Sequence, residues 1–329
     1  MRNLIYFSPV ATQPIGGVKV FYRHASLINE LKLDDWRAQV FHWEQPAFTC
    51  DWFKHQTATK TDGVFHAVSD FAILPECHLW SFWRQLLDIN VRYGIFVQGG
   101  YLIGANPSVS MEELSLAYDK ASLILTISDD TAECVRLFAP ESAHKIVHVR
   151  YSIPADLFHD CSEKQNLITF MPRKMPEHSR LVLIFLQRLL PSNWAIVPID
   201  GLPEAEVAAT LRKSKIFMSF SSLEGLPMPP AEAALCGNYV VGYTGQGALE
   251  YWEPGLFTEV AMGDIRTYVR EVLQLVHRLD IRQRLGLANL DEQARIALES
   301  LKARFTIEQE TARLRSFINR VNSLEFQSH

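Results

Sequence analysis

Two glutamates separated by seven residues, Glu224 and Glu232, form the pattern in this sequence with the clearest chemical potential. Pro229 and Pro230 lie between them, and proline favours the first turn of a helix because its missing N–H would have no partner there. The spacing therefore predicts Glu224 on a loop and Glu232 in the first helical turn, where the helix dipole also favours a phosphate. Either carboxylate could accept hydrogen bonds from the vicinal hydroxyls of a ribose or a hexose. The alternative is that Glu232 only complements its helix dipole and that Glu224 is a solvated loop residue.

The residues on either side of this pair predict the elements that would position it. Residues 215–222 (KIFMSFSS) and 238–243 (NYVVGY) are apolar runs typical of buried strands, and Gly237 between them suits the left-handed end of a short helix. A tight turn is predicted from Thr244 to Gly247. The local order of strand, loop, helix and strand indicates an α/β sheet whose site lies at the strand ends.

A basic pair follows another predicted strand. Residues 166–174 (NLITFMPRK) carry Arg173 and Lys174 directly after their apolar part. Two adjacent cations on a fixed backbone suit a diphosphate, because the arginine fork binds two oxygens and lysine adds a point charge. The alternative is an exposed basic turn.

Polar groups also follow two predicted strands in the first half of the chain. Gly16 and Gly17 come after a strand at 3–10 and open a helix, an arrangement that can cradle a phosphate or simply let the helix pack closely. Gln98 ends an apolar strand at 93–97 and precedes two glycines. A glutamine cannot act as a base at neutral pH, so it could only donate and accept hydrogen bonds.

The block Ser222 to Gly237 resembles the E-x7-E region of retaining glycosyltransferases of the GT-B fold, family 4 in particular. In that family the first glutamate contacts the donor sugar and the second contacts the nucleotide ribose. The resemblance implies two Rossmann-like, doubly wound parallel-sheet domains that face each other across a cleft. The predicted catalytic residues are Glu224, Arg173, Lys174 and Gln98, and the predicted donor-binding residues are Gly16, Gly17, Gly225, Leu226, Met228, Glu232, Thr244 and Gly245.

The resemblance implies transfer of a sugar from a nucleoside-diphosphate sugar to a glycan, lipid or small-molecule acceptor, with retention of anomeric configuration. Three departures from the family pattern keep other functions open. Pro227 replaces the usual glycine and lacks an N–H, Gln98 stands where many relatives have histidine, and Lys174 directly follows Arg173. The family lysine usually comes about five residues after the arginine, where this chain has His178, so the second cation is undecided. The alternatives are a non-catalytic regulatory or binding relative and a sugar-nucleotide epimerase or phosphorylase.

Length and composition favour two domains in a globular protein. The chain has 329 residues, and we expect an N-terminal domain at 1–155, a donor domain at 156–305, and a final helix at 306–322 that returns to the first domain. The net charge of −5 gives no reason to expect nucleic acid. Five scattered cysteines favour neither a disulfide framework nor zinc and fit a reducing cytoplasm. The absence of any D-x-D triplet gives no support for a metal site, and no cofactor beyond the donor is expected.

A tryptophan-rich stretch, residues 78–87 (HLWSFWRQLL), could bind a membrane surface, a carbohydrate ring or a neighbouring helix. Core packing is the favoured interpretation, because aromatic residues at helical spacing are most often buried. The alternative is that the N-terminal domain makes a peripheral membrane contact, which would place the protein at the inner membrane surface. No apolar run approaches the ~20 residues that a membrane-spanning helix needs.

Overall fold

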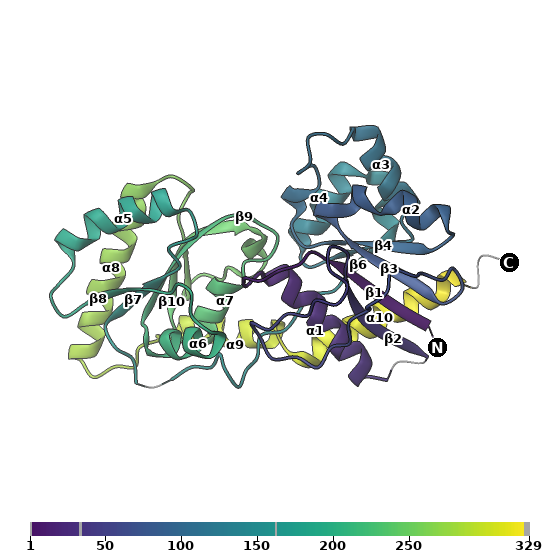
Figure 1. Ribbon diagram of the computed structural model, residues 1–329. Helices are drawn as coiled ribbons and strands as arrows, with labels where there is room; N and C mark the ends of the chain where they lie inside the picture. The colour runs from purple at the N-terminus through teal and green to yellow at the C-terminus, as the bar shows by residue number, and fades with distance from the viewer. Residues whose placement is uncertain (1, 33–34, 162, 326–329) are drawn as a thin grey trace. The chain divides into compact units, whose positions relative to one another are not determined.

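The computed structural model describes residues 2–32, 35–161 and 163–325, and it divides the chain into two compact units (Figure 1). Unit 1 comprises Met1–Tyr151 and Ile307–His329, and unit 2 comprises Ser152–Thr306. Each unit is a parallel sheet with helices between its strands, which confirms the predicted α/β fold. No helix in the described part of the chain is long and apolar enough to cross a membrane.

Unit 1 has a six-stranded sheet in the order β2-β1-β3-β4-β5-β6, and neighbouring strands in it run parallel. Its strands are β1 (Arg2–Ser8), β2 (Trp36–His42), β3 (Asp70–Pro75), β4 (Arg92–Val97), β5 (Leu123–Thr126) and β6 (Ile146–His148). Its α-helices are α1 (Gly16–Glu30), α2 (Trp83–Asp88), α3 (Met111–Lys120), α4 (Asp129–Phe138) and α10 (Ile307–Glu325). Parallel strands need crossover connections, which these helices supply.

Unit 2 has a five-stranded parallel sheet in the order β11-β10-β9-β7-β8. Its strands are β7 (Leu167–Phe170), β8 (Ala195–Pro198), β9 (Ile216–Glu224), β10 (Tyr239–Gln246) and β11 (Phe257–Glu259). Its α-helices are α5 (Pro176–Leu189), α6 (Glu204–Lys213), α7 (Met228–Leu235), α8 (Ile265–Arg284) and α9 (Glu292–Arg304). Helix α5 packs against α8, whereas α7 packs against both α6 and α9.

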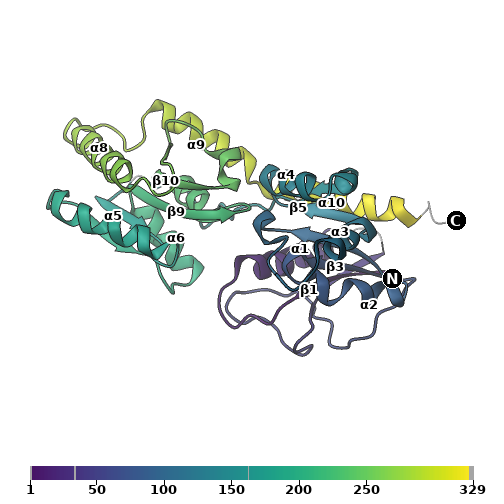
Figure 2. The same cartoon turned by 90° about the horizontal axis from the view of Figure 1, so that it is seen from above.

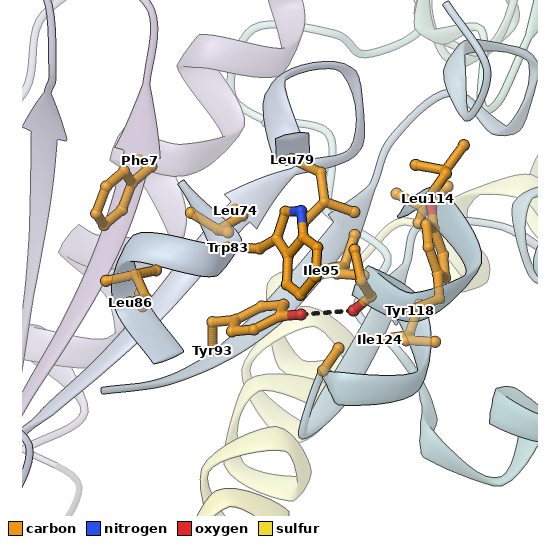
Figure 3. Close-up of a cluster of buried hydrophobic side chains, with 14 of the residues drawn as sticks. Phe7, Leu74, Leu79, Trp83, Leu86, Tyr93, Ile95, Leu114, Tyr118 and Ile124 are labelled. Atoms are coloured by element: carbon orange, nitrogen blue, oxygen red, sulfur yellow. Dashed lines mark hydrogen bonds between the residues drawn. The ribbon is translucent and has the colours of Figure 1, made fainter. Parts of the chain in front are cut away.

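The tryptophan-rich stretch contributes to the core of unit 1, as the core-packing interpretation predicted. Leu79, Trp83 and Leu86 are at most 3% exposed and belong to one hydrophobic cluster with residues of β3, β4 and α3. Figure 3 shows this cluster, in which the hydroxyl of Tyr93 donates a hydrogen bond of 2.6 Å to the carbonyl oxygen of Ala117. These apolar side chains are therefore not displayed to a membrane or a carbohydrate.

Helix α10 is tied to α1 by a buried ion pair. The guanidinium of Arg23 donates to both carboxylate oxygens of Glu310 at 2.8 to 2.9 Å, and the Glu310 side chain is 1% exposed. Trp36 adds a hydrogen bond from its indole N–H to the side-chain oxygen of Asn322 at 2.9 Å. A buried carboxylate is costly unless it is paired, so this contact holds the last helix in place on unit 1.

We expect Arg23→Ala to lower the free energy of unfolding by about 3 kcal/mol, because it leaves the buried Glu310 without three charge-assisted hydrogen bonds. Arg136→Ala is the matched control in unit 1, since the Arg136–Glu133 pair lies on the surface and should contribute under about 1 kcal/mol. Urea denaturation monitored by circular dichroism measures both. Equal losses for the two variants would contradict the role assigned to the buried pair.

Candidate functional site

The strand order of unit 2 reverses between β7 and β9, and in doubly wound sheets ligands bind at the carboxyl ends of the strands at such a reversal. Arg173 and Lys174 lie in the turn that follows β7, and Glu224 is the last residue of β9. The fold therefore brings the two sequence patterns to one edge of one sheet.

Lys174 and Glu224 form an ion pair, with 2.7 Å between Nζ and Oε2. The side chains are 35% and 23% exposed, so the pair is partly shielded from water. The other carboxylate oxygen of Glu224, Oε1, is buried and accepts no hydrogen bond from the described residues. An unsatisfied buried acceptor is costly, and a ligand hydroxyl that donates to it would remove that cost.

The other two candidate cations have different surroundings from Lys174. Arg173 is exposed beside it. His178 instead turns to Tyr243, with 3.1 Å between Nδ1 and the tyrosine hydroxyl. Of the two candidates for the second cation, Lys174 is therefore the one that contacts Glu224.

The structure corrects the predicted positions of Glu224 and Glu232. Glu224 is not on a loop, because β9 continues through it and pairs Glu224 with Gln246 of β10. Helix α7 begins at Met228, one residue before the two prolines, so Glu232 lies in the second turn. The helix dipole acts mainly on the first turn, so it supports Glu232 less than the sequence suggested. Gly237 does end the helix in the left-handed region, with φ of 80°.

The predicted tight turn from Thr244 is also wrong, because β10 runs to Gln246 with an irregularity between Thr244 and Gln246. Thr244 is 6% exposed, and its hydroxyl accepts a hydrogen bond from the Gln246 N–H at 3.4 Å. Gly245 has φ of 63°, which favours glycine. The buried Thr244 side chain thus contacts the backbone at the end of β10. Its predicted contact with a nucleotide stays a prediction.

The loop after β9 is pressed against the loop after β10. A Cβ at Gly247 would overlap the carbonyl group of Gly225, so only glycine fits there. The hydroxyl of Tyr251 donates to the carbonyl oxygen of Pro227, a contact that the sequence did not reveal. Leu226 is buried and Met228 partly buried on the same segment. These contacts with Gly247 and Tyr251 therefore fix the backbone between Glu224 and α7.

The prolines limit what the start of α7 can bind. A helix presents the N–H groups of its first four residues, and Pro229 and Pro230 have none. Pro227, the residue before the helix, lacks one as well. Any phosphate or sugar oxygen at this helix end would depend on the few remaining amides and on the charged side chains beside them.

A second set of predicted residues meets at the reversal between β1 and β3 in unit 1. Gln98 follows β4, and its amide nitrogen donates to the carbonyl oxygen of Gly17 at 3.1 Å. A Cβ at Gly17 would lie 3.3 Å from the Gln98 Oε1, so the pair is closely packed. Gly16, by contrast, starts α1 with open space where a Cβ would be. Gln98 and Gly17 thus form one local structure in which the amide nitrogen of Gln98 already donates one hydrogen bond.

Glu76 is a residue of this region that sequence reasoning missed. It directly follows β3, is 2% exposed, and accepts hydrogen bonds from the backbone N–H groups of Gln98 and Gly99 at 3.1 and 2.7 Å. Burial raises the pKa of Glu76 to about 7, although these N–H groups act in the opposite direction. An acid directly after an apolar strand was the available signal. Its role is to position the Gln98–Gly99 loop.

We expect Glu76 to make stability depend on pH. Its folded pKa of about 7 exceeds the ordinary value of 4.5, so its contribution is fully present below about pH 4.5 and is lost as pH rises through 7. The difference in unfolding free energy between wild type and Glu76→Gln should therefore shift against wild type by up to about 3 kcal/mol over this range. Urea denaturation of both proteins at pH 5 and pH 8 measures it. A pH-independent difference would show that Glu76 does not titrate there.

The site in unit 2 is open rather than enclosed. A cavity of about 10 Å³, room for roughly one water molecule, lies under Lys174 and is lined by residues of β9 and by Pro229 and Pro230. Within the described residues, no group of three histidine, cysteine, aspartate or glutamate side chains is placed to hold a metal ion.

Two doubly wound parallel sheets in one chain define the GT-B fold, and solved structures confirm this architecture. Sucrose-phosphate synthase from Thermosynechococcus elongatus is similar with a TM-score of 0.71 and 10% identity, over 98% of this chain and 100% of that chain. HepE from Anabaena in complex with UDP-glucose is similar with a TM-score of 0.68 and 13% identity, over 97% and 100%. The catalytic domain of starch synthase IV from Arabidopsis thaliana, bound to ADP and acarbose, gives 0.52 and 8%, over 96% and 99%. No protein-family model and no curated protein matches the sequence.

Proposed function

We propose that this protein transfers a sugar from a nucleoside-diphosphate sugar to an acceptor, with retention of anomeric configuration and without a metal ion. The observation that carries the proposal is the Lys174–Glu224 pair at the strand reversal of unit 2, in which the buried Oε1 of Glu224 has no hydrogen-bond partner among the described residues. Fold neighbours solved with UDP-glucose or ADP support a nucleotide donor.

In this proposal the bond between the anomeric carbon and the diphosphate oxygen breaks, and a bond forms to an acceptor oxygen on the same face. The acceptor proton passes to the departing diphosphate. Negative charge grows on that diphosphate, so preformed cations beside it stabilise the transition state more than the ground state. Arg173, which is exposed, and Lys174 are assigned this role in place of a metal ion.

Glu224 and Glu232 receive different roles, as in the E-x7-E pattern of family 4. Lys174 pairs with one carboxylate oxygen of Glu224 and so limits the rotation of the carboxylate. The second oxygen, Oε1, is assigned to accept a hydrogen bond from a hydroxyl of the transferred sugar. Glu232 lies further along α7 and is assigned to the ribose, which does not react. The acceptor is left as a glycan, a lipid or a small molecule.

Nucleotide binding is the first test. We expect UDP or ADP, or their sugars, to raise the thermal unfolding midpoint, because a ligand at 100 times its Kd stabilises the folded state by about 2.7 kcal/mol. Arg173→Ala and Lys174→Gln should each weaken binding at least tenfold in calorimetry, since each removes a charge-assisted hydrogen bond to phosphate. EDTA should leave the affinity unchanged.

Lys213→Ala is the control for that experiment, because Lys213 is an exposed lysine at the far end of α6 in the same unit. It should bind the nucleotide as wild type does. Unchanged affinity in both Arg173→Ala and Lys174→Gln would contradict the proposal that the diphosphate binds at this edge of the sheet.

The two glutamates are separated by a second test. Glu224→Gln should lower the turnover of donor, measured as release of nucleoside diphosphate with water as acceptor, while the affinity for free nucleoside diphosphate is preserved. Glu232→Gln should weaken that affinity and raise the Michaelis constant for donor. If Glu224→Gln alone abolishes nucleotide binding, or if both variants behave alike, the sugar is misplaced in this assignment.

A second candidate function is a non-catalytic relative that binds a nucleotide or a partner without transferring sugar. The three prolines at 227, 229 and 230 favour it, because they remove N–H groups from the helix end beside the site. This candidate predicts nucleotide binding with no release of nucleoside diphosphate from any donor, with or without acceptor.

A further inference from the structure

The outer face of α5 and α8 in unit 2 combines exposed apolar side chains with arginines. The two helices pack against each other and lie side by side in both views (Figures 1 and 2). Ser179, Val182 and Leu186 are the buried residues of α5, and α8 is likewise buried along one side only. The opposite side of each amphipathic helix is therefore turned away from the sheet.

The exposed side of this helix pair is unusually apolar. Six large hydrophobic side chains there are between 42% and 66% exposed, namely Leu181, Ile184, Phe185, Leu189, Ile281 and Leu285. The four on α5 follow one another at spacings of three, one and four residues, which places them along one side of the helix. Single exposed apolar residues need no explanation, but a continuous stripe marks an interaction surface.

The same helices are strongly cationic. Together α5 and α8 carry seven arginines and three carboxylates, Glu177, Glu271 and Asp280, a net charge of +4 in a chain whose total is −5. Asp280 is turned inward, where it accepts hydrogen bonds from Trp194 and Asn193. Six of the seven arginines are exposed to solvent, namely Arg180, Arg188, Arg266, Arg270, Arg278 and Arg284.

We propose that this surface, the α5/α8 face, docks on an anionic lipid bilayer. Apolar side chains flanked by arginines match the boundary between acyl chains and acidic headgroups. The apolar side chains can enter the acyl region while the arginines pair with the anionic headgroups. A second copy of the chain is disfavoured as the occupant, because a two-fold contact would oppose two faces of the same positive charge. Because Leu79, Trp83 and Leu86 of the tryptophan-rich stretch are buried in the core of unit 1, this face is the stronger membrane candidate.

Bilayer docking by the α5/α8 face does not depend on donor binding at the strand ends. The arginines of the α5/α8 face differ from Arg173, and its apolar residues differ from those that line the site at the strand ends. A protein without nucleotide binding could therefore still bind the bilayer, and the converse also holds.

Co-sedimentation with vesicles tests the proposal. We expect the full chain to partition onto equimolar phosphatidylcholine and phosphatidylglycerol at least tenfold more strongly than onto phosphatidylcholine alone, and to dissociate as salt rises. Phe185→Gln with Leu189→Gln should weaken this partitioning about tenfold, and so should Arg270→Gln with Arg284→Gln. All four side chains are exposed, so the thermal midpoint should be unchanged.

The matched control is Arg295→Gln with Ile296→Gln on α9, because it removes an exposed arginine and an Ile that is 65% exposed from a helix that packs on α7 instead of on α5 and α8. This variant should bind vesicles within twofold of wild type. Equal binding of wild type to both vesicle compositions, or loss of binding only in the α9 control, would overturn the proposal. So would light scattering that shows a dimer which Phe185→Gln with Leu189→Gln converts to monomer.

Discussion

The close approach of two backbone segments at the ends of β9 and β10 is the constraint on which the candidate site depends. Gly247 lets the second segment lie against the carbonyl group of Gly225, and Glu224 is paired in register with Gln246. The backbone that carries Glu224 is thereby set before any ligand arrives. Lys174 then contacts one oxygen of the carboxylate, and the other, Oε1, is buried and has no hydrogen-bond partner among the described residues. A ligand that binds an acceptor already ordered in this way loses less conformational entropy than one whose acceptor must be ordered on binding.

Unit 1 uses buried carboxylates for a different purpose. Glu310 holds α10 through the Arg23 guanidinium, and Glu76 holds the Gln98–Gly99 loop through two backbone N–H groups. In each case a polar group is taken out of water and compensated by charge-assisted hydrogen bonds. The difference is that Glu310 has a cationic partner, whereas Glu76 has only amides, and burial raises the pKa of Glu76. The Gln98–Gly99 loop is thus held by a carboxyl group whose raised pKa makes the contact sensitive to pH.

Charge is distributed unevenly over the chain. The overall charge is negative, yet α5 and α8 are cationic and carry the apolar stripe that defines the α5/α8 face. The candidate site lies at the carboxyl ends of β7 and β9, whereas Leu189 and Leu285 lie at the C-terminal ends of the helices that run back toward the other edge of the sheet.

The sequence by itself determined the alternation of strands and helices, because apolar runs and glycines report local structure. It also placed Arg173 and Lys174 directly after a strand, because a polar residue that follows an apolar run is a local signal, whereas it put Glu224 on a loop instead of at the end of β9. Only the tertiary structure decided that Lys174 and not His178 contacts Glu224, that Glu232 lies in the second turn of α7, and that β10 continues past Thr244. Those outcomes depend on pairing between β9 and β10 and on where a helix can begin against its neighbours. The position of Glu76 directly after an apolar strand is a local signal, but its partners are 22 and 23 residues away, so only the tertiary structure shows its role.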